Sequence, residues 1–235
     1  MKVAAIVTGK GSSQLKNKNL IKILGKPLMH YPCIEAKKCK EIKKFYVSSE
    51  DNKILNYASK LGFKKIKRPK ILSKKNTLHI DVINNAIKFI NKENFYPDII
   101  VILLANAPMI KNSWIKKSIN LMKKNKKISS VVPVYIDNDH NPFRAKKLKG
   151  KFLKSFINSK KKISSNRQYL PKSFFLCHNF WTIKVSEIKK LNGDQPWSFM
   201  GKNVFPLIVN KTYDVHNQDD IEILKVLMKK FIKYS

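Results

Sequence analysis

The amino-acid sequence predicts an α/β fold in which a mostly parallel β-sheet lies between two layers of helices. Strand-like and helix-like segments alternate through the first 135 of the 235 residues, which is the pattern of a parallel sheet with crossover helices. Residues 98–104 are almost entirely apolar, as expected for a parallel strand that is covered on both faces. A hydrophobic content of 43% over this length is enough to bury a substantial core.

The elements of the first half follow from the spacing of their apolar residues. Strands are expected at residues 2–8, 45–48, 63–66, 98–104 and 129–135, and helices at residues 27–40, 50–61, 78–89 and 113–124. Pro27 suits the first turn of a helix, because the N–H that proline lacks has no partner there in any case. Glu50 and Asp51 suit the first turn of the second helix, because acidic side chains stabilise a helix N-terminus. Ligands are expected at the loops that follow the carboxyl ends of the strands.

The pattern changes after residue 141. Lys149 and Gly150 separate two short strand-like segments, which predicts a β-hairpin, and a lysine-rich polar loop follows. The last elements are expected as a strand at 174–183, a helix at 184–191, a strand at 203–209 and an amphipathic helix at 218–231. We predict one domain over residues 1–235, with residues 137–200 as an inserted hairpin that acts as a lid or a dimer arm.

The charge of the chain is strongly positive. It has 49 basic and 15 acidic residues, for a formal net charge of +34. All but three of the basic residues are lysines, and many occur as pairs on predicted helix faces, which favours a solvated surface. Nucleic-acid sites prefer arginine and interleaved aromatic residues, so we expect only weak nonspecific attraction to polyanions. The acid-free stretch at residues 140–186 suits an anionic small substrate as well as a nucleic acid.

Several classes of protein are not favoured by the sequence. The longest apolar run, residues 99–110, is too short for a membrane span, which needs about 20 residues. The N-terminus lacks the pattern of a signal peptide, so we expect a cytoplasmic protein with no membrane attachment. The three cysteines have no paired spacing and are expected to be reduced core thiols, and the histidines are not clustered at zinc spacing.

A glycine-containing loop follows the first strand and is the first candidate site. From Gly9 it is G-K-G-S-S-Q-L-K-N-K-N. Small residues let backbone N–H groups approach phosphate oxygens, and lysines such as Lys10 neutralise their charge. The spacing matches neither of the common nucleotide-binding loops. By itself the loop is equally consistent with an ordinary turn.

Together with Leu24-Gly25-Lys26-Pro27-Leu28, this loop resembles the opening of CMP-sugar synthetases. These cytidylyltransferases activate sialic acid and related nonulosonic acids, or the eight-carbon sugar acid of lipopolysaccharide. In the sialic-acid branch the opening is R-x-G-S-K-x-x-P-x-K-N, followed by L-x-G-K-P-L. The residues that match the loop pattern are Gly11, Ser12, Lys18 and Asn19. Gly9 stands where the family has arginine.

Further matches to the family follow in the same order along the chain. Arg68-Pro69 matches an R-P element, and Thr77 falls on a polar position after it. The family's Q-P-T-S-P segment is replaced by one that contains Asn106. Pro142-Phe143-Arg144 corresponds to a P-x-K element whose cation helps to hold the sugar acid.

The strongest match is Arg167-Gln168-Tyr169-Leu170-Pro171, against R-Q-D-L-P in the sialic-acid branch. Asn179 falls on the asparagine of the family's N-G-A-x-Y. Near the end, residues 213–220 resemble I-D-I-D-T-x-E-D, in which two aspartates serve the metal. Asp214 matches the first aspartate and His216 replaces the second.

The three arginines, Arg68, Arg144 and Arg167, all fall on motif positions in a chain that otherwise uses lysine. A guanidinium group offers a planar pair of donors that lysine cannot imitate. Bidentate recognition of a carboxylate, a phosphate or a base is therefore expected at these positions, and a structural salt bridge is the alternative for each.

The resemblance implies a Rossmann-like three-layer sandwich and transfer of CMP from CTP to a 2-keto-3-deoxy sugar acid, with release of pyrophosphate. It implies a homodimer and a requirement for Mg²⁺, held by Asp214. The catalytic residues would be Lys18, Asp214 and His216. The nucleotide would be bound by Lys10, Gly11, Ser12, Asn19, Arg68 and Thr77. The sugar acid would be bound by Asn106, Arg144, Arg167, Gln168 and Asn179.

Two alternatives stay open at this point. One is a transferase that acts on another nucleotide or sugar. The other is a noncatalytic protein of the same fold whose basic surface binds RNA or another polyanion. For His216, contact through a metal-bound water, a hydrogen bond to phosphate or sugar, and a purely structural role are all possible, because Mg²⁺ prefers oxygen ligands.

Overall fold

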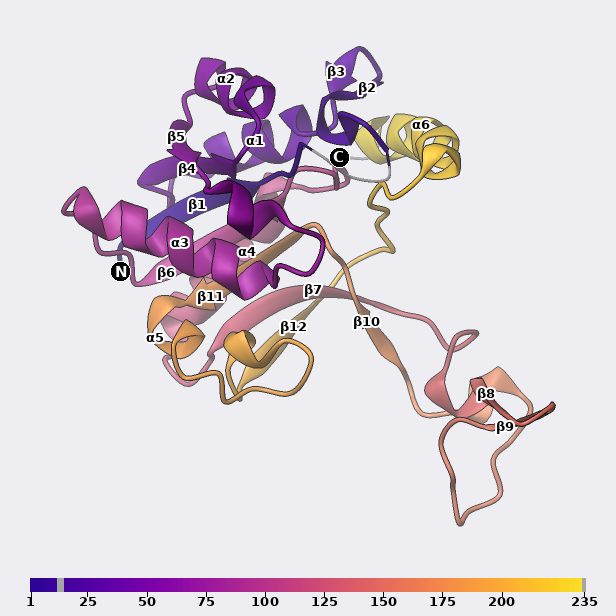
Figure 1. The fold of residues 1–235 in the computed structure, drawn as a ribbon. Coiled ribbons are helices and arrows are strands. Elements are labelled where there is room, and N and C mark those ends of the chain that lie inside the picture. The colour runs from indigo at the N-terminus through magenta and orange to yellow at the C-terminus, as the bar shows by residue number, and fades with distance from the viewer. Residues whose placement is uncertain (12–14, 234–235) are drawn as a thin grey trace.

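The computed structural model describes residues 1–11 and 15–233 and contains an α/β fold (Figure 1). Within this part of the chain, the central sheet has eight strands in the order β10-β7-β11-β6-β1-β4-β5, with β12 paired to β7. The strands are β1 (Val3–Thr8), β4 (Lys44–Ser49), β5 (Lys64–Lys67), β6 (Ile99–Leu104), β7 (Ser130–Ile136), β10 (Phe174–Leu176), β11 (Phe180–Lys184) and β12 (Val204–Ile208). Four of the seven pairings in this described sheet are parallel, so the predicted α/β class with a mostly parallel sheet is confirmed.

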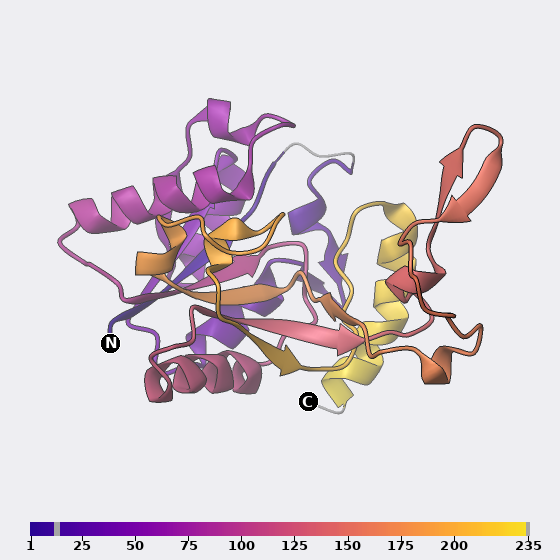
Figure 2. The same cartoon turned by 90° about the horizontal axis from the view of Figure 1, so that it is seen from below.

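Helices cover both faces of the sheet because its central strands are apolar on both sides. They are α1 (His30–Lys37), α2 (Asn52–Lys60), α3 (His79–Lys92), α4 (Asn112–Lys124), α5 (Val185–Ile188) and α6 (Gln218–Lys233). Val3, Ala5 and Val7 of β1 pack in one core cluster with residues of α1, α2 and α4. Ala4 and Ile6 pack on the opposite face with α3 and α5. Figure 2 shows the sheet between α3 on one side and α4 on the other.

The C-terminal helix α6 packs beside the sheet on a small hairpin. This hairpin consists of β2 (Lys22–Ile23) and β3 (Lys26–Pro27), which pair antiparallel. Leu224 and Met228 of α6 are fully buried in a separate apolar cluster with Ile23 and Leu28. The packing brings the loop before α6 to the segment that follows β1.

Residues 137–173 leave the sheet between β7 and β10 and form an arm. Within it, β8 (Lys146–Lys149) and β9 (Phe152–Ser155) pair antiparallel and are separate from the central sheet. Their turn contains Gly150, whose φ of 62° is in the left-handed region that glycine adopts without strain. Figures 1 and 2 show the arm standing away from the sheet. Because β10 and β11 pair within the central sheet, residues 174–184 belong to the body of the molecule.

Three predicted boundaries are wrong. The helix expected from residue 27 begins at His30, because Pro27 pairs with Lys22 in the small hairpin. The strand expected at 174–183 is two strands, because the chain turns at residues 177–179 and β11 moves between β6 and β7. The helix expected at 184–191 is reduced to Val185–Ile188.

No helix within residues 1–11 and 15–233 has the length and apolar content to cross a membrane. The cysteines are buried free thiols, as the sequence predicts. Burial raises the pKa of Cys33 to about 12, which leaves this thiol protonated and unreactive.

Candidate active site

A cavity of about 280 Å³ opens at the carboxyl ends of β1, β5 and β6. Parallel strands end at this edge of the sheet, and their loops meet there. The residues that line the cavity are Thr8, Gly9, Lys10, Lys18, Asn19, Arg68, His79, Leu104 and Asn106. Five of the sequence-predicted site residues are among them, namely Lys10, Lys18, Asn19, Arg68 and Asn106. We call this cavity the central pocket.

The loop after β1 lines one side of the central pocket, and close contacts fix its position. The buried Asn19 side chain donates to the carbonyl oxygen of Lys10 at 2.9 Å, and its own backbone carbonyl accepts from Met29 at 3.1 Å. A Cβ atom at Gly11 would lie 2.5 Å from a carboxylate oxygen of Asp51. Glycine is therefore required at position 11 for the close approach of the loop to α2. Ser12, predicted to bind nucleotide, lies outside the described residues.

Arg68 and Glu50 form a buried ion pair beneath the same loop. Arg68 Nη2 donates to Glu50 Oε2 at 2.6 Å and to the carbonyl oxygen of Gly9 at 2.7 Å. Glu50 also accepts from the Gly11 N–H at 2.8 Å and from the Ser73 hydroxyl at 2.8 Å. Burial raises the pKa of Glu50, but hydrogen bonds from Arg68 and Ser73 outweigh it and lower the pKa to about 2. The pair fixes the loop to the sheet edge with a permanently charged carboxylate.

Lys18 and Asn106 meet the loop before α6 on the other side of the central pocket. Lys18 Nζ donates to the carbonyl oxygen of Val215 at 2.8 Å. Asn106 Nδ2 donates to the same carbonyl oxygen at 3.0 Å and to Asp214 Oδ2 at 3.4 Å, and the Val215 N–H donates back to the Asn106 carbonyl at 3.0 Å. Asp214 Oδ2 also contacts His216 Nε2 at 2.9 Å. The structure thus brings together four predicted site residues from three distant parts of the sequence.

The loop that carries Asp214 is itself fixed by the start of α6. Asp220 Oδ2 accepts from the backbone N–H groups of His216 and Asn217 at 2.6 and 2.9 Å, and Asn217 Oδ1 accepts from the Asp220 N–H at 3.0 Å. This reciprocal arrangement is a capping box. Asp220 therefore caps α6 and positions His216 and Asn217 of the loop, and it does not line the central pocket.

Burial lowers the pKa of Lys18, and the carboxylates of Asp214 and Asp220 oppose that shift. An ammonium, a carboxylate, an imidazole and an amide are thus gathered beside the loop that follows β1. Such a set can hold an anionic polyphosphate and orient it. Among the described residues no group of three or more His, Cys, Asp or Glu is arranged as a metal cage. A single carboxylate suits Mg²⁺, which is commonly held by one or two carboxylates together with substrate phosphates.

Two residues of the central pocket were not predicted from the sequence. Thr8 is the last residue of β1, and His79 is the first residue of α3. Thr8 Oγ1 lies 3.2 Å from His79 Nε2. Thr8 could have been predicted as a site residue from its position at the carboxyl end of the first strand. For His79 the sequence contains no indication except its position two residues after Thr77.

Thr77 and Asn179, which the sequence predicted to bind substrate, have structural contacts instead and do not line the central pocket. The Thr77 hydroxyl donates to the carbonyl oxygen of Ile71 at 3.1 Å and closes the loop before α3. Asn179 is fully buried; its Nδ2 donates to the carbonyl oxygen of Met109 at 3.0 Å, and its Oδ1 accepts from the Phe180 N–H at 2.8 Å. These bonds tie the start of β11 to the segment after β6. Asn179 thus supports the pocket wall, because its side chain has no free surface.

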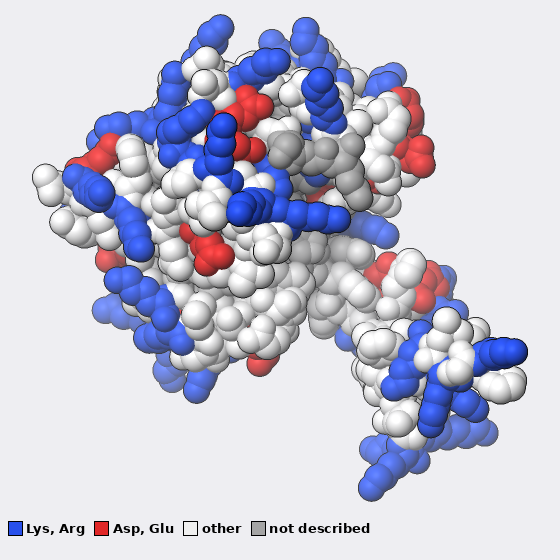
Figure 3. Space-filling view, in the orientation of Figure 1, with Lys and Arg blue, Asp and Glu red and all other residues white. Residues whose placement is uncertain are grey.

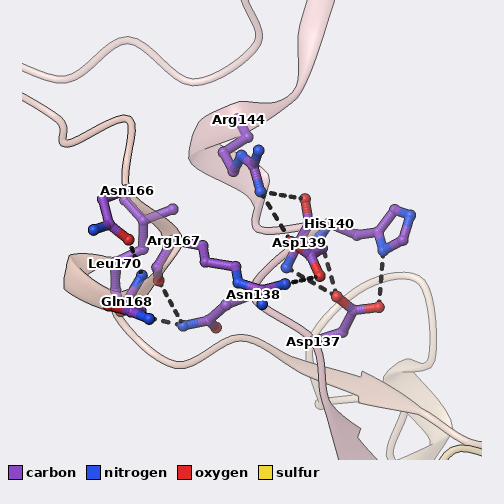
Figure 4. Close-up of polar contacts among 9 residues, drawn as sticks. All are labelled: Asp137, Asn138, Asp139, His140, Arg144, Asn166, Arg167, Gln168 and Leu170. Atoms are coloured by element: carbon purple, nitrogen blue, oxygen red, sulfur yellow. Dashed lines mark hydrogen bonds and ion pairs between the residues drawn. The ribbon is translucent and has the colours of Figure 1, made fainter.

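Arg144, Arg167 and Gln168 lie on the arm and do not line the central pocket (Figure 4). The two guanidinium groups converge on one carboxylate, that of Asp139. Arg144 Nη1 lies 3.4 Å from Asp139 Oδ1, and Arg167 Nη1 donates to Asp139 Oδ2. Asn138 donates to the carbonyl oxygen of Arg167 at 3.2 Å and holds the short helical turn Arg167–Tyr169. In this structure both arginines are thus paired with a carboxylate of the chain itself, at an exposed position of the arm.

Comparison with known proteins identifies a family that this chain matches. The cytidylyltransferase family model matches residues 4–175. The pseudaminic acid cytidylyltransferase of Campylobacter jejuni serotype O:2 is 32% identical over 120 residues, which are 50% of this chain and 52% of that protein. The chain therefore aligns with about half the length of this curated relative. The post-translational flagellin modification protein B of Campylobacter coli is 26% identical over 228 residues, covering 94% of this chain and 92% of that protein.

Solved structures show the same fold at low sequence identity. A CMP:2-keto-3-deoxy-manno-octonic acid synthetase complexed with CTP has a TM-score of 0.71 and 15% identity, covering 98% of this chain and 99% of that chain. A 4-diphosphocytidyl-2C-methyl-D-erythritol synthase from Anaerococcus prevotii has a TM-score of 0.65 and 13% identity, covering 97% and 96%.

Proposed function

Because this chain belongs to the cytidylyltransferase family, we propose that it transfers CMP from CTP to a 2-keto-3-deoxy sugar acid of the sialic or nonulosonic type. A hydroxyl oxygen of the sugar acid attacks the α-phosphorus of CTP, and the bond from that phosphorus to the pyrophosphate oxygen breaks. Support for this acceptor class comes from the pseudaminic acid cytidylyltransferases among the relatives. We also propose that the reaction takes place in the cytoplasm, where the three free thiols would stay reduced.

The observation that carries the proposal is the meeting of Lys18, Asn106 and Asp214 at the edge of the central pocket. The contacts join the segment after β1, the segment after β6 and the loop before α6. Nucleotidyl transfer needs the triphosphate to be neutralised and held in line with the attacking hydroxyl. Positive, amide and carboxylate groups on three separate segments around one pocket supply those contacts from different directions.

We assign the nucleotide to the central pocket and the phosphates to the loop beside it. Lys10, Ser12 and Lys18 would bind phosphate oxygens, while Gly11, whose N–H is used on Glu50, lets the loop pass close to Asp51. Asn19, Arg68 and Thr77 would fix the nucleoside, with Thr77 acting by closing the loop before α3. Lys18 uses one of its three N–H donors on Val215, which leaves two for phosphate. His216 is the proposed acceptor of the hydroxyl proton, and Asp214 orients its imidazole through the 2.9 Å contact.

Asp214 is also the residue that would hold Mg²⁺. Its Oδ2 atom faces His216 and Asn106, so Oδ1 is the oxygen offered to a metal. The bound ion would neutralise phosphate charge as a Lewis acid. The one carboxylate fits this role when phosphate oxygens complete the shell.

We propose that two copies of the chain form a dimer through the arm. Leu148, Phe152 and Leu153 of its hairpin are 74%, 70% and 68% exposed, and an isolated two-stranded hairpin is marginal in water. Figure 3 shows the arm as a projection rich in Lys and Arg, with acidic residues where it leaves the body. A second copy would cover the apolar side chains. It would also bring Arg144, Arg167 and Gln168 to the acceptor side of the partner's pocket, while Asn106 and the supporting Asn179 act within the same chain.

The test is pyrophosphate release by the purified full chain with CTP, Mg²⁺ and a panel of sialic, pseudaminic and eight-carbon sugar acids. We expect turnover with CTP and a nonulosonic acid and none without the sugar acid. Turnover with another nucleotide or sugar would identify a different transferase. Absence of turnover together with tight, salt-sensitive binding of RNA would favour the noncatalytic polyanion-binding alternative.

A further inference from the structure

His79 is a pocket residue to which the reaction outlined above gives no role. It begins α3 and lines the central pocket together with Thr8 and Arg68. Its ring is packed against Trp181, with 5.4 Å between ring centroids. A histidine held in this way at the wall of a nucleotide pocket has a fixed position and two distinct ring nitrogens, so its tautomer decides what it can bind.

The hydrogen bonds of Thr8 determine that tautomer. Thr8 Oγ1 lies 3.4 Å from the carbonyl oxygen of Leu103 and 3.2 Å from His79 Nε2. Both contacts can be hydrogen bonds at the same time only if the single hydroxyl proton of Thr8 points to Leu103, because a carbonyl oxygen only accepts. The hydroxyl oxygen then accepts from His79, which places the imidazole proton on Nε2 and leaves the lone pair on Nδ1. Nδ1 makes no contact within the described part of the chain.

The surroundings keep this imidazole neutral. Burial lowers the pKa of His79 to about 4, and the positive charge of Arg68 acts in the same direction. The ring also lies at the N-terminus of α3, where the partial positive charge of the helix disfavours protonation of the imidazole. At neutral pH Nδ1 is therefore a hydrogen-bond acceptor and not a donor.

Arg68 supplies the complementary group. Its side chain is 5% exposed, and Nη2 is used on Gly9 and Glu50, but Nε is buried with no hydrogen-bond partner. A buried donor without a partner is unfavourable unless a ligand satisfies it. Arg68 and His79 both line the central pocket, so an unpaired buried donor belongs to the same wall as the Nδ1 acceptor.

We propose that His79 Nδ1 accepts a hydrogen bond from the exocyclic amino group of the nucleobase and is the residue that selects CTP over UTP. This inference rests on the proposed function and adds a specificity-determining residue to it. Cytosine presents an amino group at position 4, whereas uracil presents a carbonyl oxygen there. That oxygen would face the Nδ1 lone pair with no proton between them. The unpaired Arg68 Nε suits a carbonyl or ring-nitrogen acceptor on the same base.

The experiment measures the dissociation constants of CTP and UTP by calorimetry, with Mg²⁺ and without sugar acid, so that no turnover is needed. His79→Gln keeps a donor near Thr8 but removes the Nδ1 acceptor, and we expect the CTP-to-UTP preference to fall by about tenfold or more. His79→Asn places an amide oxygen near the former Nδ1 position and should retain most of the preference. Thr8→Val removes the hydroxyl that sets the tautomer and should give a partial loss.

His178→Gln is the matched control. His178 contacts the same Trp181, with ring centroids 6.0 Å apart, but it does not line the central pocket. Its variant should keep the wild-type preference. An unchanged preference in folded His79→Gln and Thr8→Val, with CTP bound normally by the wild type, would overturn this inference and leave the proposed function standing. Failure of the wild type to bind CTP would overturn both.

Discussion

The ammonium group of Lys18 donates to the carbonyl oxygen of Val215 at 2.8 Å, across 197 positions of sequence. This contact joins the phosphate-binding side of the central pocket to the loop that carries Asp214. Asn106 donates to the same carbonyl oxygen from a third segment. The relative position of ammonium and carboxylate is thereby set by backbone atoms and not by a direct ion pair, which leaves both charges available to substrate.

Lys18→Gln should therefore reduce turnover much more than stability. The amide keeps a donor for Val215 but removes the positive charge, and losing one such stabilising group typically costs 10²–10³-fold in rate. Pyrophosphate release and the thermal midpoint would be measured on the same preparation. Lys22→Gln, at an exposed position of β2, is the control and should be neutral in both assays. A Lys18 variant with normal turnover would remove this residue from the proposed catalytic set.

Asp214→Asn should lower turnover by orders of magnitude while the fold is retained, because it removes the carboxylate charge and keeps the shape. The remaining amide can still face Asn106 and His216, so the loop should keep its place. Activity would be followed as a function of Mg²⁺ concentration. Near-normal rates at saturating Mg²⁺ would show that Asp214 is not the metal ligand. The companion variant His216→Asp restores a second carboxylate. If His216 is the proton acceptor proposed above, this variant should lose activity, whereas retained or raised activity would place position 216 in the metal shell.

The sheet was predictable because its central strands are apolar on both faces. Residues 99–104 and the first strand have no polar face, and only a sheet covered by helices on both sides buries such segments. The split between β10 and β11 was not predictable in the same way. Residues 174–183 are mostly apolar and aromatic, and the polar pair His178-Asn179 at the turn is too short a signal to separate two strands by itself. The turn becomes evident only from the pairing of the two strands with different neighbours.

The site was predictable where motif residues fall on loops at the carboxyl ends of strands. Lys18, Asn106 and Asp214 are of this kind, and the topology brings them together. The role of Asn179 was not predictable, because the sequence does not distinguish a buried asparagine that bonds to backbone groups from one that binds substrate. The role of His79 depends on a hydrogen bond from Thr8, 71 positions away, and no local pattern encodes that contact.

The Glu50–Arg68 pair should make stability depend on pH in the acid range. The pKa of Glu50 is lowered to about 2 in the folded chain, below its ordinary value of 4.5. A lowered folded pKa stabilises the fold above the unfolded pKa, and this contribution is lost as pH falls from about 4.5 toward 2. The shift corresponds to roughly 3 kcal/mol at most. Urea unfolding at a series of pH values would measure it.

Glu50→Gln should be less stable than the wild type at neutral pH and should lack this acid-range loss. Glu222→Gln is the matched control, because Glu222 pairs with Lys225 at an exposed position and such pairs contribute little. Parallel pH profiles for the wild type and Glu50→Gln would mean that this carboxylate does not carry the acid sensitivity.

Arg167, on the arm, is predicted to bind the sugar acid and not to stabilise the fold. Arg167 and Asp139 are both more than half exposed, so their ion pair contributes little to stability and substitution should barely move the thermal midpoint. Arg167→Lys keeps the charge but loses the two-pronged donor. We expect the Michaelis constant for the sugar acid to rise roughly 10- to 150-fold, the equivalent of about 1.5–3 kcal/mol, with little change for CTP. Equal effects on both substrates would place Arg167 outside the acceptor site.

Co-expression of Arg167→Ala and Asp214→Asn chains then tests whether the arm reaches across a dimer. Each variant alone should be nearly inactive. If the arm of one chain completes the pocket of the other, each mixed dimer has one pocket with both Asp214 and Arg167 intact. A statistical mixture would then recover about a quarter of the wild-type sites, because half of the dimers are mixed and one of their two pockets is complete. If Arg167 acts on the pocket of its own chain, every pocket lacks one of the two residues and mixing restores nothing. Recovery of activity, measured as pyrophosphate release at equal total protein with the sugar acid that the wild type accepts, therefore separates the two arrangements.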